Sequence, residues 1–205
     1  PVSHHLAASK ALDVIVGARK LTPAAEKLRR LMHYGQMLQS HALHFFHLCS
    51  PDLLFGFDSD VTKRNIVGVA MEHPETAKRG VLLRKFGQEV IRVTAGKRVH
   101  GTGAVPGGVN KSLTIAERDE LLTDIYHIVH TQDPGLYNSF GIFRSNFMSL
   151  VGHNGDLDFY HGTLRARDDN GNLIFDHLDY QNYNQVIEEE VRSWSYMKFP
   201  YIRSI

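Results

Sequence analysis

The sequence has little of what several protein classes depend on. It holds a single cysteine, Cys49, which excludes an internal disulfide framework and fits a reducing compartment. The net charge is only +1 and the basic residues are dispersed, so nothing favours nucleic acid or an anionic membrane as a partner. No apolar run approaches the roughly 20 residues that cross a bilayer. Pro1–His5 has no signal-peptide character.

What is present is the composition of an ordinary soluble globular protein, with helical periodicity in its first two thirds. We expect a helix over His4–Val16 that ends at Gly17, and a longer helix with Thr22 as N-cap and Pro23 at its first position. In the longer helix, apolar or small residues recur at spacings of three and four, which predicts the heptad seam of an antiparallel bundle. The seam residues are Leu28, Leu31, Gly35, Leu38, Ala42, Phe45 and Cys49. Gly35 would let a neighbouring backbone come close.

Capping signals mark the helices that follow. Ser50–Pro51 predicts the start of a short helix, and Asp60 predicts the cap of a helix through Val61–Met71. Pro74 starts another helix, which Gly96 ends. A second apolar stripe lies on that helix, at Leu83, Phe86, Val90 and Val93.

The residues after this helix predict a loop and then one more helix. The Gly- and Pro-rich stretch 101–110 predicts a loop without regular structure, and its VPGGV segment lacks the spacing that cradles phosphate. Thr114 and Glu117 form a capping box for a helix that fades near Asp133–Gly135.

The last third of the chain changes character. Tyr160–Arg167 alternates like a strand, and Asp169–Gly171 predicts a hairpin turn before Leu173–Phe175. A final helix is expected over Tyr183–Trp194. The sequence therefore predicts an α+β, predominantly α fold. Residues 1–152 would form an antiparallel helical bundle, and residues 153–205 a β-hairpin plus helix appendage in the same domain.

The sequence holds thirteen histidines, a high count that suggests metal binding. His41 and His44, or His44 and His47, are near enough on one helix to share an ion, but all three cannot converge from a straight helix. Packing or interface histidines explain the trio as well. His4 and His5 point to different faces of their helix, and spacing alone makes neither catalytic. From the residues themselves, no complete active site emerges.

Several segments, in order along almost the whole chain, resemble the large subunit of [NiFe] hydrogenases, most closely its NAD-linked, bidirectional branch. The matching segments are Pro1–Asp13, Pro23–Leu31, His41–Leu48, Ser50–Gly56, Leu83–Ile91, Val105–Asp119 and Trp194–Tyr201. The resemblance implies a cytoplasmic enzyme that splits H2 reversibly. It also implies partner proteins that pass the electrons to NAD: a small Fe–S subunit, together with diaphorase subunits that carry FMN and Fe–S clusters.

The same resemblance implies where the metals are held. In the family, cysteine thiolates bridge nickel and iron, and CO and cyanide bind the iron. The cysteines lie in RxCGxC and DPCxxC motifs. Cys49 matches neither motif, so the resemblance describes an internal piece without the metal ligands, inactive alone. His4 matches a histidine that hydrogen-bonds a bridging thiolate, and His47 one near the boundary with the Fe–S subunit.

Two other interpretations stay open. One is a cysteine-less relative kept as a structural or electron-transfer subunit, like the related quinone-reductase subunit of respiratory complexes. The other is an independent His-rich helical binding module. A departure from the family also stands out: between Asp119 and Met148, relatives have a longer helical segment.

Overall fold

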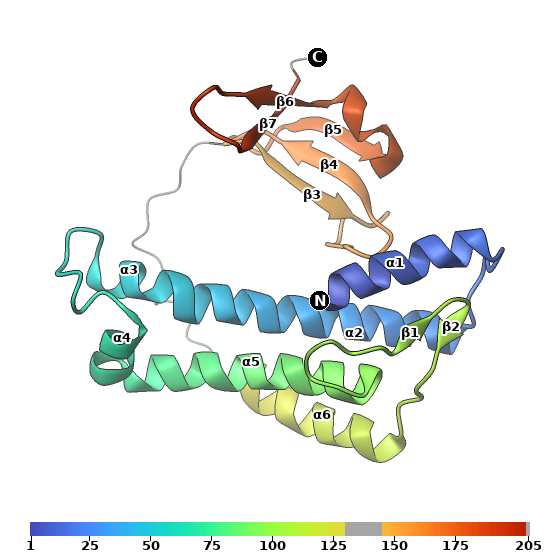
Figure 1. Cartoon of the computed structure of the whole chain (residues 1–205), viewed down its shortest axis with the longest axis horizontal. Coiled ribbons are helices and arrows are strands. Elements are labelled where there is room, and N and C mark those ends of the chain that lie inside the picture. Colours follow the sequence, from blue (N-terminus) through green and yellow to red (C-terminus); the bar gives the residue numbers. More distant parts are fainter. Residues whose placement is uncertain (130–144, 204–205) are drawn as a thin grey trace. The chain divides into compact units, whose positions relative to one another are not determined.

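The computed structural model describes residues 1–129 and 145–203, and the chain divides into two compact units, Pro1–Phe140 and Gly141–Ile205 (Figure 1). The first unit is helical. Its helices are α1 (Val2–Ile15), α2 (Pro23–Leu43), the π-helix η1 (His44–Cys49), α3 (Ser50–Phe55), α4 (Ile66–Glu72), α5 (Pro74–Ala95) and α6 (Ile115–Val129). The expected end of the last helix near Asp133–Gly135 lies outside the described residues, as does most of the segment expected to be shortened.

Three helix boundaries predicted from the sequence, at Gly17, Thr22 and Gly96, are present in the structure. The Thr22 hydroxyl accepts a hydrogen bond from the Ala25 amide at 3.3 Å, and Pro23 follows at the first helical position. Gly17 and Gly96 both have positive φ after their helices, at +75° and +80°. These signals are local in the chain, which is why the sequence alone could reveal them.

The crossing of α2 and α5 is the centre of the helical unit, and Figure 1 shows the two helices side by side. A methyl group on Gly35 would lie 2.8 Å from Val90 Cγ1, and one on Gly87 would lie 2.7 Å from the Gln39 backbone nitrogen. The two glycines therefore allow the backbones to approach, as expected for Gly35. The half-buried Leu31 and Leu38 of the seam pack against Phe86, Val90, Val93 and Leu121.

The short helix α3 is not a separately capped element, which corrects the sequence prediction. The chain passes from α2 through η1 into α3, and the Ser50 hydroxyl donates to the Phe46 carbonyl at 2.5 Å instead of capping an N-terminus. Pro51 has no N–H to donate to the carbonyl of His47, four residues earlier. The wider π-turn accommodates that missing donor within a continuous helix.

Helix α4 begins later than predicted. Asp60 accepts a hydrogen bond from the Thr62 amide at 2.9 Å and closes a turn, whereas Asn65 caps α4 by accepting from the Val67 and Gly68 amides. Both residues are good helix caps. The sequence contains two residues that could start the helix, and because Asp60 closes a turn, α4 begins after Asn65.

A buried ion pair ties α1 and α2 to the loop after α5. Arg29, with 0% of its side chain exposed, donates to both carboxylate oxygens of Asp13, at 2.5 and 3.1 Å. It also donates to the carbonyls of Val105 and Gly108 at 2.7 and 3.1 Å, while the Gly107 amide donates to Asp13 at 2.7 Å. The loop expected to be irregular thus holds a minimal hairpin, β1 (Ala104–Val105) with β2 (Gly108–Val109). We call this arrangement the Arg29–Asp13 clamp.

An apolar cluster lies beside the clamp and joins the same elements. Its members are Val2, Leu6, Met32, Ile91, Ala95 and Ala104, each at most 4% exposed. On α1 the buried positions are Val2, Leu6, Ser9 and Asp13. Because these recur at helical spacing, the clamp continues the apolar stripe of α1, and together they fix one face of this helix.

The second unit is antiparallel β structure. Strands β3 (Phe147–Val151), β4 (Thr163–Arg167) and β5 (Leu173–Leu178) form one sheet in that order, and the predicted hairpin turn at Asp169–Gly171 joins the last two. β3 precedes the boundary expected after residue 152 yet pairs with β4 beyond it. That both units form a single domain stays a prediction. The α+β, predominantly α class with a small β-hairpin part is confirmed.

The expected final helix over Tyr183–Trp194 is wrong. A 3-10 helix, η3 (Tyr180–Gln185), is followed by β6 (Ile187–Val191), which pairs with β7 (Lys198–Ile202). Two of the three glutamates of β6 find partners on or just after β7: Glu188 accepts from Tyr201 at 2.6 Å and pairs with Arg203, and Glu189 pairs with Lys198 at 2.8 Å. A glutamate run favours helix locally, but cross-strand partners far along the chain favour the hairpin.

We predict that Gly87→Ala destabilises the helical unit by about 1–2 kcal/mol. The added methyl group meets backbone at the α2–α5 crossing, and overpacking of this kind costs about 1–3 kcal/mol. Alanine's higher helix propensity offsets up to about 1 kcal/mol of that loss. Urea unfolding measures the difference. Gly108→Ala is the matched control, because a methyl group there meets nothing within 4 Å. Equal or higher stability of Gly87→Ala would contradict the close crossing.

We predict that Asp13→Asn destabilises the chain by about 3–5 kcal/mol, because it leaves the Arg29 charge buried without its carboxylate. The hydrogen bond from Arg29 lowers the pKa of Asp13 below its ordinary value of 3.8. The clamp's stabilisation is therefore complete above pH 3.8 and is lost as the pH falls through the lowered pKa.

Unfolding measured from neutral to acid pH tests this, and the variant should lose part of the wild-type acid dependence. Asp119→Asn, at an exposed ion pair with Arg118, is the control and should cost at most about 1 kcal/mol. A clamp variant as stable as the wild type would contradict the account.

Candidate functional site

His4, the residue to which the family resemblance gives a role at the metal site, lies in the first turn of α1. Its side chain is exposed, whereas the neighbouring His5 is half-buried, as expected for adjacent residues on a helix. The Nε2 atom of His5 is buried and finds no hydrogen-bond partner within the described residues. The face of α1 opposite His4 is held by the clamp and by the packing of Val2 and Leu6. His4 therefore stands on an anchored helix with its imidazole open to a partner.

The histidines at the end of α2 do not assemble into a cluster. His41 Nδ1 lies 2.7 Å from the Met37 carbonyl of its own helix, and His44 lies against Cys49, with Nδ1 3.4 Å from the sulfur. His47 is half-buried in η1, and its Nδ1 is buried without a hydrogen-bond partner in the described structure. Cys49 itself is half-buried.

The residues present do not fit a nickel–iron centre. Such a centre needs several thiolates, and the sequence supplies only Cys49. Within residues 1–125 and 145–203, no three side chains of His, Cys, Asp or Glu come together as metal ligands.

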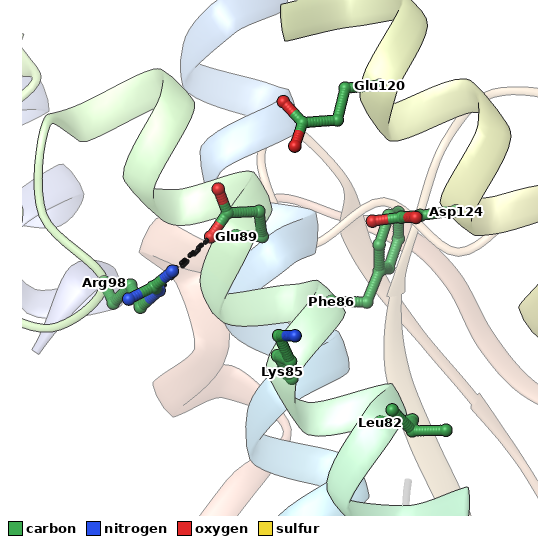
Figure 2. Close-up of a pocket in the computed structure, with 7 residues that line it drawn as sticks. All are labelled: Leu82, Lys85, Phe86, Glu89, Arg98, Glu120 and Asp124. Atoms are coloured by element: carbon green, nitrogen blue, oxygen red, sulfur yellow. Dashed lines mark hydrogen bonds and ion pairs between the residues drawn. The ribbon is translucent and has the colours of Figure 1, made fainter.

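A cleft of about 350 Å³ opens between α5 and α6, and Figure 2 shows the side chains that line it. Glu89 accepts hydrogen bonds from Arg98 at 3.0 and 3.2 Å and another from Arg92. Burial raises the pKa of Glu89, but the hydrogen bonds from the two arginines outweigh it, so this pKa lies below its ordinary value. Glu89 is thus held as a carboxylate that joins α5 to the segment after it, and it is poorly suited to donate a proton.

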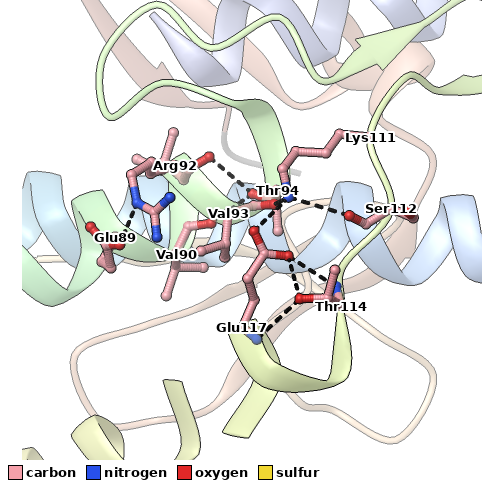
Figure 3. Close-up of polar contacts among 10 residues, drawn as sticks. Glu89, Val90, Arg92, Val93, Thr94, Lys111, Ser112, Thr114 and Glu117 are labelled. Atoms are coloured by element: carbon pink, nitrogen blue, oxygen red, sulfur yellow. Dashed lines mark hydrogen bonds and ion pairs between the residues drawn. The ribbon is translucent and has the colours of Figure 1, made fainter. Parts of the chain in front are cut away.

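A second polar network connects the end of α5 to the start of α6 (Figure 3). Lys111 donates to the Val93 carbonyl at 2.6 Å and to Glu117 at 2.8 Å. The predicted capping box is present, since Thr114 and Glu117 exchange hydrogen bonds through their side chains and amides. The hydrogen bond from Lys111, with the Thr114 amide, lowers the pKa of Glu117 to about 2. The network fixes a helix junction and leaves no proton-transfer group.

Sequence reasoning missed the clamp, whose signal is an acidic and a basic residue on the buried stripes of two neighbouring helices. Asp13 continues the stripe of Val2, Leu6 and Ser9, and Arg29 lies between Ala25 and Met32. A charge on an apolar stripe predicts a buried ion pair only once its partner is known.

In the described part of the chain, no helix combines the length and apolar character that a membrane crossing requires.

No profile of a known protein family matches the sequence. Individual relatives do. The chain is 41% identical over 228 residues to the NAD-reducing hydrogenase HoxS subunit beta of Cupriavidus necator, covering 100% of this chain and 46% of the relative. It is 38% identical over 218 residues to one subunit of the F420-non-reducing hydrogenase vhu of Methanococcus voltae, covering 99% and 51%. The chain spans about half the length of the curated relatives it matches.

Solved structures agree with these relatives. The chain superimposes on an NAD+-reducing [NiFe]-hydrogenase in the H2-reduced state with a TM-score of 0.81 and 51% identity, covering 99% of this chain and 48% of that one. The [NiFeSe]-hydrogenase of Dm. baculatum, at 19% identity and a TM-score of 0.54, shares the fold. The chain is therefore a homologue of the [NiFe] hydrogenase large subunit, matched over about half of its length.

Proposed function

We propose that this chain is part of the catalytic large subunit of a cytoplasmic NAD-reducing [NiFe] hydrogenase, an enzyme that oxidises H2 reversibly. The observation that carries the proposal is the similarity to NAD-reducing hydrogenases in both sequence and fold, over essentially the whole chain. A match to an F420-non-reducing hydrogenase at 38% identity also supports hydrogenase chemistry. In this proposal the partner subunits determine which electron acceptor is reduced.

In this proposal the chain supports the metal centre without holding it. The thiolates that bind nickel and iron, with CO and cyanide on the iron, would come from sequence outside these 205 residues. His4 would donate a hydrogen bond to a bridging thiolate, reducing electron density on the sulfur and fixing its orientation. Its exposure on an anchored helix suits this role, because the imidazole can reach a partner while α1 stays in place.

Electron transfer would depend on other subunits. We propose a small Fe–S subunit, with His47 near its boundary, and diaphorase subunits that carry FMN and Fe–S clusters and reduce NAD. The half-buried position of His47 in the π-helix, with a buried Nδ1 lacking a hydrogen-bond partner in the described residues, is compatible with a site beside an interface. π-helices occur frequently at functional sites.

A second candidate function is a cysteine-less, hydrogenase-like protein that serves as a structural or electron-transfer scaffold. The single cysteine favours it, since Cys49 is paired with His44 and matches neither cysteine motif of the family. Infrared spectra of the protein that contains this chain separate the two. CO and cyanide bands indicate the catalytic subunit, and their absence from the intact complex indicates the scaffold.

We predict that the 205-residue chain alone shows neither H2 uptake nor the infrared bands of iron-bound CO and cyanide. The reason is that it offers one thiol where the centre needs several. Gas uptake with an artificial electron acceptor and infrared spectroscopy are the measurements, with the intact enzyme complex as positive control. H2-dependent reduction by the pure chain would contradict the proposal.

In the intact subunit, we predict that His4→Ala lowers the H2 oxidation rate by about 10- to 100-fold, the usual effect of removing a hydrogen bond to a metal ligand. Nickel content and the CO and cyanide bands should persist, because His4 binds no metal in this proposal. Ser3→Ala, at an exposed neighbour on α1, is the control. Complete loss of nickel would instead make His4 part of metal assembly, and an unchanged rate would remove its proposed role.

A further inference from the structure

A bulge in the second unit places a histidine in an unusual backbone conformation. Leu164 pairs with Leu178 and Ala166 pairs with Phe175, so Asp176 and His177 both lie opposite Arg165. His177 has a φ of +52°, in the left-handed region that glycine normally occupies. β-Bulges re-aim side chains and are enriched next to active sites, and residues in sparsely populated backbone conformations cluster at functional sites. The imidazole of His177 is therefore a candidate functional group.

A second imidazole lies beside it. His153, in the turn after β3, has its ring centroid 5.9 Å from that of His177, with 30° between the ring planes. Arg165 lies beside both segments: it donates twice to Asp176, at 2.7 Å each, and its Nη1 would lie 3.1 Å from a methyl group added to Gly155. The ion pair thus joins β4 to the bulge beside the turn, and both imidazoles stay at the surface.

The ring nitrogens of His177 suit a metal ligand. Its Nδ1 lies 3.4 Å from the Thr163 hydroxyl, and its Nε2 lies 3.8 Å from the Asp176 carboxylate, which adds negative charge near that nitrogen. Metal-binding histidines commonly donate their other ring N–H to an oxygen, which fixes the tautomer and the ring. With Nδ1–H donating to Thr163, Nε2 of His177 would be free to bind an ion.

His153, the second ligand, is as accessible to an ion as His177. His153 is exposed and the side chain of His177 is 46% exposed, so an ion can enter from solvent. Zinc–nitrogen bonds are about 2.0–2.1 Å long, so one ion can bridge rings this close once His153 rotates about its side-chain torsions. Imidazole is a preferred ligand of Zn²⁺, Ni²⁺ and Cu²⁺.

We propose that His153 and His177 bind a divalent transition-metal ion, with water completing its coordination, and that the ion clips the turn after β3 to the β4–β5 bulge. Asp176 adds charge near the ion, but Arg165 occupies its carboxylate, which leaves two protein ligands. The site belongs to the second unit alone. It is independent of the proposed hydrogenase function, because it uses neither His4 nor the cysteine ligands of the nickel–iron centre.

Zinc titration of the full, tag-free 205-residue chain by calorimetry tests the site. The wild type should bind one zinc ion per chain that is lost, or weakened about 100-fold or more, in His153→Ala and in His177→Gly, because a chelate is replaced by one ligand. His177→Gly is informative because glycine accepts the backbone conformation of that position, so the sheet keeps its fold while the imidazole is removed. Far-ultraviolet circular dichroism verifies the fold of each variant.

Two further variants sharpen the result. Thr163→Val removes the oxygen that orients His177 and should weaken zinc binding about 10- to 100-fold. His161→Ala, at an exposed histidine in the same unit, should leave binding unchanged. The proposal is overturned if the wild type binds no zinc at this stoichiometry, if the folded His177→Gly variant binds as the wild type does, or if His161→Ala loses the same ion.

Discussion

The helical unit depends on the buried contact between Arg29 and Asp13. One guanidinium, with no exposed surface, joins α1 through Asp13 and the loop after α5 through the Val105 and Gly108 carbonyls. Two charges in a core are costly unless they are paired and hydrogen-bonded, so an arrangement of these three segments that broke these contacts would be disfavoured. The glycine crossing of α2 and α5 then sets how closely the remaining helices approach.

This arrangement has a consequence for function. The clamp is near the end of α1, and His4 is in its first turn, where Val2 and Leu6 pack into the apolar cluster on either side of it in the sequence. Both ends of the helix are therefore fixed while His4 stays exposed. A side chain that orients a metal ligand must itself be held by rigid elements. The anchored α1 meets that requirement for the role we propose for His4.

The sequence predicted several features that local chemistry decides, although α3 lacks the predicted cap and α4 begins later than predicted. The caps at Thr22 and Thr114, the stops at Gly17 and Gly96, and the close approach at Gly35 all follow from residues near one another in the chain. Features that need distant partners were missed: Arg29 needs Asp13, and two glutamates of β6 need β7. The role proposed for His4 rests on the resemblance to the hydrogenase family and not on residue spacing. The approach of His153 to His177 depends on a bulge and a turn that no spacing reveals.

We propose that this chain is part of a catalytic hydrogenase subunit whose metal ligands lie elsewhere in the same protein. Sequencing the gene on both sides of this segment tests it most directly. The account predicts an RxCGxC motif in frame before Pro1 and a DPCxxC motif downstream of Ile205. Flanking sequence that encodes the rest of the subunit without those cysteines would contradict it and would make the protein a cysteine-less relative.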